Sequence, residues 1–156
     1  MRIISVSENK KIEKRIAITP EIAKKYITIG FDVSLPENYG AHLGFKDDDY
    51  KKLGVKISNN ENEIISSADV IVQLGLPSED KISHFKENQN LIGVFDPYNN
   101  KEVIDALAKK KINVFSLELL PRITRAQSMD ILSSQANLAG YKAVLESFTN
   151  FEKAIP

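Results

Sequence analysis

The chain has 156 residues, which is enough for one compact core, because single domains usually take about 100 to 200 residues. Its 21 Lys and Arg balance 21 Asp and Glu, so no net positive charge favours a nucleic acid or an anionic bilayer as a partner. The absence of cysteine excludes disulfides and thiolate chemistry. Because no secretory signal and no run of roughly 20 apolar residues occurs, we expect a cytoplasmic protein that binds no nucleic acid.

The first stretch of the chain predicts a strand, a helix and a second strand. Residues 2–6 form a short apolar run, typical of a strand. Thr19 and Pro20 then supply a helix N-cap and a proline at the first helical position, and Gly30 ends the helix. Residues 31–35 alternate between apolar and polar side chains, which indicates a strand.

Strands and helices continue to alternate along the rest of the chain. The pattern predicts helices over 45–52, 61–66 and 100–111, and strands over 55–57, 68–74, 90–95 and 112–117. This alternation predicts the α/β class, with a mainly parallel sheet covered by helices on both faces, a Rossmann-like or flavodoxin-like three-layer architecture. A long C-terminal connecting helix follows from residue 131. We expect an α/β domain over 1–130, and over 131–156 a helix leading to a nucleotide-binding domain outside this chain.

Polar side chains are densest between residues 121 and 141, after the last strand and at the start of the long helix. Ligands of open α/β sheets bind at such positions. Gln127 can offer donors and an acceptor to a carboxamide, and Asp130 can hold Arg122 or Arg125 in place. Alternatively, Asp130 is simply the N-cap of the helix and the arginines are solvated loop charges. The residue types alone leave both interpretations open, and they indicate no metal site.

Two stretches resemble signatures of one protein family. RAQSMDILSSQANLAGY, which starts at Arg125, is similar to the signature of the nicotinamide nucleotide transhydrogenase family, in its NAD(H)-binding alpha component. EKRIAITP, at residues 13–20, resembles a second signature, which that family shares with alanine dehydrogenase. The family's usual Gly-x-Pro after the first strand is replaced by Ser-Val-Ser at residues 5–7. The resemblance covers essentially the whole chain.

The resemblance implies a role for the loop at residues 122–130. In the family this loop reaches over bound NAD(H) and orients the nicotinamide for direct hydride transfer to NADP(H) on a partner domain. No proton moves in such a step, so the loop would act by positioning. Gln127 and Asp130 would be the catalytic residues. The implied cofactor-binding residues are Arg122, Gln127, Ser128, Met129, Asp130, Ser133 and Tyr141.

The same resemblance favours transhydrogenase over alanine dehydrogenase. Alanine dehydrogenases hold pyruvate with an arginine, a lysine and a histidine. Arg15 fits the first, but Gly75 and Asp96 occupy the positions of the other two. Glycine has no side chain to bind the substrate, and an aspartate would repel its carboxylate. We therefore expect Arg15 to pair with an acid such as Asp96 or Glu118 and to brace the loop.

The chain contains no G-x-G-x-x-G fingerprint, so the grip on the NAD(H) pyrophosphate is expected in a Rossmann domain that follows it in the full enzyme. The resemblance further implies NADP(H)-binding and membrane partners of a proton-translocating enzyme, a homodimer, a location peripheral to the inner membrane, and an isolated chain without activity. The alternative is a stand-alone binding or regulatory module with this fold and no redox activity. An alanine dehydrogenase domain is the weaker third possibility.

Overall fold

A computed structural model describes residues 1–153, and the contacts within it divide the chain into two compact units. The first, Met1–Ser116, contains the sheet and is called the sheet unit. The second begins at Leu117 and is called the loop–helix unit. The boundary expected at residue 130, between a domain and a connecting helix, stays a prediction.

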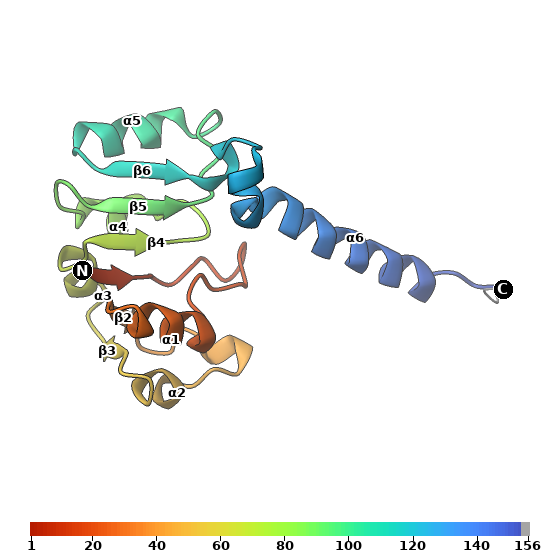
Figure 1. Ribbon diagram of the computed structural model, residues 1–156, viewed down its shortest axis with the longest axis horizontal. Coiled ribbons are helices and arrows are strands. Elements are labelled where there is room, and N and C mark those ends of the chain that lie inside the picture. Colours follow the sequence, from red (N-terminus) through yellow and green to blue (C-terminus); the bar gives the residue numbers. More distant parts are fainter. Residues whose placement is uncertain (154–156) are drawn as a thin grey trace. The chain divides into compact units, whose positions relative to one another are not determined.

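The sheet unit contains six strands in the order β3-β2-β1-β4-β5-β6, shown side by side in Figure 1. Every strand pairing among the described residues is parallel. The expected α/β class and the Rossmann-like sheet are therefore confirmed. The strands are β1 (Arg2–Ile4), β2 (Asp32–Pro36), β3 (Lys56–Ser58), β4 (Val70–Val72), β5 (Asn90–Gly93) and β6 (Asn113–Ser116).

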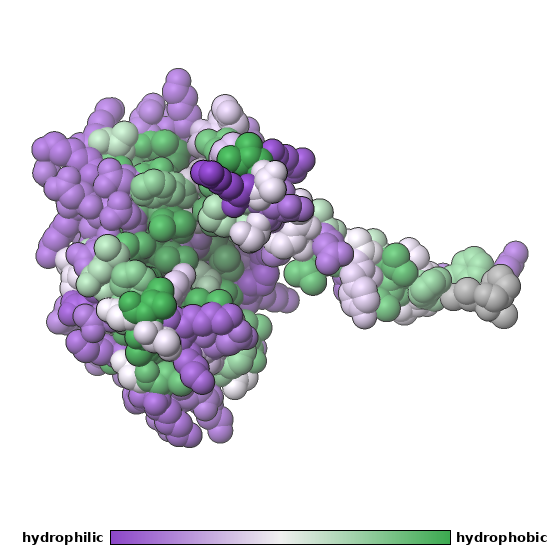
Figure 2. Space-filling view, in the orientation of Figure 1, coloured by the Kyte–Doolittle hydropathy of each residue, from purple (hydrophilic) through white to green (hydrophobic). Residues whose placement is uncertain are grey.

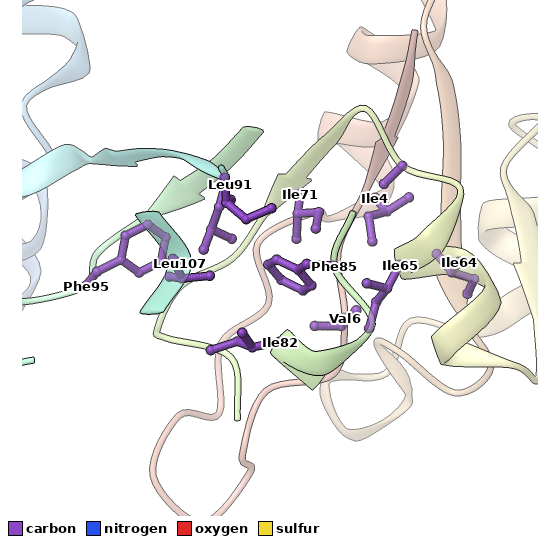
Figure 3. Packing of buried hydrophobic residues seen from close by; sticks show 12 residues of the cluster. Ile4, Val6, Ile64, Ile65, Ile71, Ile82, Phe85, Leu91, Phe95 and Leu107 are labelled. Carbon is purple, nitrogen blue, oxygen red and sulfur yellow. The ribbon is translucent and has the colours of Figure 1, made fainter. Parts of the chain in front are cut away.

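Helices connect the strands and cover both faces of the sheet, since two separate apolar clusters form on it. One cluster packs Ile4, Ile71 and Leu91 of the strands against α3, α4 and α5, and Figure 3 shows Phe85 at its centre. The other packs strand residues such as Val33 against α1 and α2. The helices are α1 (Pro20–Thr28), the short 3-10 helix η1 (Ala41–Leu43), α2 (Asp47–Lys51), α3 (Glu61–Ser66), α4 (Glu79–Ser83) and α5 (Lys101–Lys109).

Most elements lie where the sequence predicts them. Thr19 caps α1, its hydroxyl accepting a hydrogen bond from the Ile22 N–H at 3.4 Å, and Gly30 follows the helix with a φ of 91° that favours glycine. The helix expected over residues 45–52 is shorter, since α2 covers only Asp47–Lys51. The sequence analysis did not predict α4.

The loop–helix unit contains three helical segments, η2 (Leu117–Leu119), η3 (Thr124–Met129) and α6 (Ile131–Thr149). The loop expected over residues 122–130 is thus largely a 3-10 helix. The long C-terminal helix is confirmed. A Cβ added at Gly140 would meet no described atom within 4 Å, so within the described chain nothing packs closely at this glycine. No helix in residues 1–153 is both long and apolar enough to span a bilayer.

Candidate functional site

A cavity of about 380 Å³ lies in the loop–helix unit, where η3 meets the start of α6. It brings together four side chains that the sequence analysis singled out, namely those of Arg122, Gln127, Asp130 and Ser133. The loop before η3 and the first turn of α6 supply its wall. The complete lining is Leu120, Pro121, Arg122, Ile123, Thr124, Ala126, Gln127, Asp130 and Ser133.

Asp130 joins the two helical segments that form this cavity. It follows η3 directly and is the N-cap of α6, where its Oδ1 accepts a hydrogen bond from the Ser133 N–H at 3.1 Å. Its Oδ2 accepts a second hydrogen bond from the Ser133 hydroxyl at 2.7 Å. The expected N-cap is thus confirmed, and the cap fixes the geometry at which η3 enters α6.

The hydrogen bonds from Ser133 hold the pKa of the Asp130 carboxyl below its ordinary value, and the positive charge of Arg122 acts in the same direction. Asp130 therefore presents a carboxylate to the cavity at neutral pH. Arg122 interacts with it through charge, since no ion pair between these two side chains occurs in the described residues. Cap and charge partner are compatible roles for the same carboxylate.

Gln127 and Arg122 are the two cavity residues whose polar groups remain available to a ligand. Within residues 1–153, neither the Gln127 carboxamide nor the Arg122 guanidinium hydrogen-bonds to another protein group. Gln127 can therefore donate and accept at once, which matches the carboxamide of a nicotinamide. Arg122 adds a fixed positive charge at the same opening.

A second cavity, of about 360 Å³, lies on the α6 side of η3. Gln127, Asp130 and Ser133 line both cavities, and Ser128 and Met129 line only this one. Tyr141 lines neither cavity and is 67% exposed further along α6. The structure thus brings six of the seven expected cofactor-binding residues together, and the contact expected of Tyr141 stays a prediction.

The other signature places Arg15 in the sheet unit. Its Nη2 forms an ion pair with Glu13 Oε2 at 2.6 Å, an acid that the sequence analysis did not consider as its partner. Glu13 thereby acquires a lowered pKa. Gly75 follows β4, and Asp96 is exposed, with φ of 45°, after β5. Asp96 accepts a hydrogen bond from the Asn99 side chain at 2.7 Å.

Sequence reasoning missed the apolar portion of the cavity wall. Leu120, Ile123 and Ala126 line the larger cavity beside the polar residues, and such mixed linings are usual for small-molecule sites. Their three-residue spacing fits one face of a 3-10 helical segment. That spacing was the available signal, but the surrounding charges gave the stretch the composition of a polar loop.

The fold and the cavity define a Rossmann-like α/β domain that presents a polar loop at the start of a long helix. The profile of the family described as alanine dehydrogenase/PNT, N-terminal domain, matches residues 5–139. The chain therefore belongs to this family.

Individual relatives agree with this assignment. The chain is 44% identical over 160 residues to the first of the separately encoded portions of NAD(P) transhydrogenase subunit alpha from Rickettsia prowazekii, covering 100% of this chain and 42% of the relative. Identity is 39% to the protein of the same name from Rhodospirillum rubrum, again over 100% of this chain and 42% of the relative. The chain thus spans less than half the length of these curated relatives.

A solved structure and a more distant relative complete the comparison. The crystal structure of a transhydrogenase from Sinorhizobium meliloti matches 100% of this chain and 46% of its own, with a TM-score of 0.92 and 38% identity. Alanine dehydrogenase 1 of Staphylococcus aureus is 28% identical over 93% of this chain and 38% of its own length. Alanine dehydrogenase is therefore the more distant of the two similarities.

Proposed function

We propose that this chain is the amino-terminal domain of the NAD(H)-binding component of a proton-translocating NAD(P) transhydrogenase, and that its loop positions the nicotinamide for hydride transfer. The observation that carries the proposal is the cavity in which the unengaged Gln127 carboxamide stands beside Arg122 and the cap formed by Asp130 and Ser133. The full-length similarity to transhydrogenase alpha subunits supports it.

The cavity residues divide the work of positioning. Gln127 pairs with the nicotinamide carboxamide and so selects which face of the ring is presented. Asp130 and Ser133 hold the segment that carries Gln127 in one geometry, and Arg122 balances the charge of Asp130. The bound nucleotide itself supplies the hydride chemistry. None of these residues has to gain or lose a proton, so they act through geometry.

The remaining components of the enzyme are proposed to lie outside this chain. A Rossmann domain binds the NAD(H) pyrophosphate, because residues 1–156 contain no glycine-rich fingerprint for it. Another component binds NADP(H), and a membrane component couples the transfer to proton movement. The assembled protein is proposed to be a homodimer on the cytoplasmic side of the inner membrane, held there by its partner subunits, and the chain alone to be inactive.

The test is Gln127→Asn in the full-length enzyme. Shortening the side chain by one methylene withdraws the carboxamide but keeps its chemistry, so we expect the hydride-transfer rate to fall about tenfold or more, a barrier change of about 1.4 kcal/mol. NADH affinity, measured by calorimetry, should change less than about twofold, because the pyrophosphate site supplies most of the binding.

Gln135→Asn is the matched control, since it shortens the same side chain at a position of α6 that lines neither cavity. This variant should transfer hydride at the rate of the unmodified enzyme. If Gln127→Asn lowered rate and affinity equally, Gln127 would be a binding anchor and the positioning role would be wrong.

A further inference from the structure

The carboxyl ends of β1 and β4 form the topological switch point of the sheet unit. From β1 the chain proceeds outward to β2 and β3, and it then returns to place β4 on the other side of β1. Open α/β sheets bind their ligands in the crevice at such a point. Both strands belong to the sheet unit, so a ligand at this point would contact the sheet unit itself.

Glu8 occupies this position with its own carboxylate. Its Oε1 accepts a hydrogen bond from the Leu74 N–H at 2.6 Å, immediately beyond β4. The Gly75 N–H and the Gln73 side chain also hydrogen-bond to the carboxylate. Glu8 is partly buried, and burial raises the pKa of its carboxyl in spite of these three donors. The chain thus brings a charged group out of water to reach these donors.

Neutral N–H groups hold this carboxylate, because the nearby cations have other partners. Lys81 donates from Nζ to the Ser7 carbonyl at 2.6 Å and forms an ion pair with Glu61 at 3.2 Å. Arg15 is paired with Glu13. No ion pair to Glu8 occurs among the described side chains. The arrangement therefore selects a carboxyl group by the direction of its donors rather than by net charge.

The donors themselves are fixed by a buried network. Gln73 is 3% exposed, and its side chain clamps the backbone of Val6, accepting from N and donating to O at 3.3 Å each. The Tyr39 hydroxyl donates to the Ser5 hydroxyl at 2.7 Å, and Ser5 reaches Gln73 at 3.5 Å. A donor set that is held this rigidly keeps its geometry when the group it binds is removed.

We propose that Glu8 fills a carboxyl-binding site at this sheet edge from within the chain, and that the same site takes a small free monocarboxylate once the Glu8 carboxyl is removed. In the native chain the switch point is therefore closed to small carboxylate substrates. This inference does not depend on the function proposed for the loop–helix unit.

Glu8→Ala in the full chain is the decisive variant, because it deletes a CH2–COO⁻ group that acetate replaces atom for atom. The melting temperature is measured in sodium acetate and in sodium chloride of equal ionic strength. We expect Glu8→Ala to melt several degrees below the unmodified chain in chloride and to regain most of that loss in acetate, saturably. The unmodified chain should show no such difference between the salts.

Two controls separate the site from general effects. Glu8→Gln keeps an oxygen acceptor for the Leu74 N–H, so acetate should not change its melting temperature. Glu37→Ala removes an exposed carboxylate elsewhere in the sheet unit and should behave as the unmodified chain. Amide resonances locate the bound acetate, and in Glu8→Ala those of Leu74 and Gly75 should shift most.

Three results would overturn the proposal. The first is a Glu8→Ala melting temperature that responds to acetate no more than that of the unmodified chain. The second is a Glu8→Ala chain that stays unfolded in acetate. The third is an acetate effect whose largest amide shifts lie away from residues 73–75.

Discussion

The two units of the chain treat their apolar side chains in opposite ways. In the sheet unit, α5 turns Leu107 inward to full burial. In the loop–helix unit, α6 leaves Leu138, Tyr141 and Phe148 between 51% and 67% exposed, and Figure 2 shows apolar side chains among polar ones along its surface. The sheet unit therefore supplies most of the stability of the chain, while the loop–helix unit resembles segments that open at low free energy and carry function.

The largest effect is expected where the sheet unit is most tightly packed. A Cβ added at Gly93 would lie 2.2 Å from the Gln73 carbonyl oxygen and 2.6 Å from the Phe95 ring. Gly93→Ala should therefore lower the free energy of unfolding by about 3 kcal/mol or more, because a backbone atom cannot move aside cheaply. Urea denaturation measures this change. An unchanged midpoint would show that the β4–β5 edge is looser than described.

A pair of leucines compares the two units directly. Leu107→Ala removes a side chain that is 0% exposed and should cost about 2 to 5 kcal/mol. Leu138→Ala alters a side chain that is 59% exposed and should change the stability of the chain by less than about 0.5 kcal/mol. Equal losses in chemical denaturation of the two variants would contradict the contrast between the units.

The smallest effect is expected at the cap of α6. The Asp130 carboxyl has a lowered pKa in the folded chain, so its contribution to the helix is present above the ordinary Asp pKa and is lost as the pH falls through the folded pKa. Amide exchange in the first turn of α6 should therefore quicken under acidic conditions, after correction for the intrinsic rate. In Asp130→Ala this turn should be open at neutral pH already. A pH-independent first turn in the unmodified chain would contradict the cap.

The sequence predicts the sheet unit well where local chemistry and periodicity agree. The α1 helix has its N-cap at Thr19 and Pro20 at its first position, and the buried strands stand out as apolar runs. The short α4 escaped prediction because Ser78 makes no side-chain cap and only Ile82 of its five residues is buried. Five residues are too few for a helical period to be recognised.

The site was predicted unevenly for similar reasons. Gln127 and Asp130 could be singled out through the family resemblance and the polar clustering, and the cap at Asp130 follows from ordinary helix chemistry. The 3-10 helix η3 gives no strong periodic signal, because such helices are short. Contacts such as Glu8 with Leu74 join residues 66 positions apart, and only the assembled sheet reveals them.

The central claim is that Gln127 positions the nicotinamide, and a structure of the full-length protein with bound NADH tests it most directly. The decisive quantity is the distance between the Gln127 carboxamide and the nicotinamide carboxamide. The account predicts a direct hydrogen bond, with donor and acceptor about 2.7 to 3.2 Å apart. An ordered nicotinamide that contacts neither Gln127 nor the segment capped by Asp130 would contradict it.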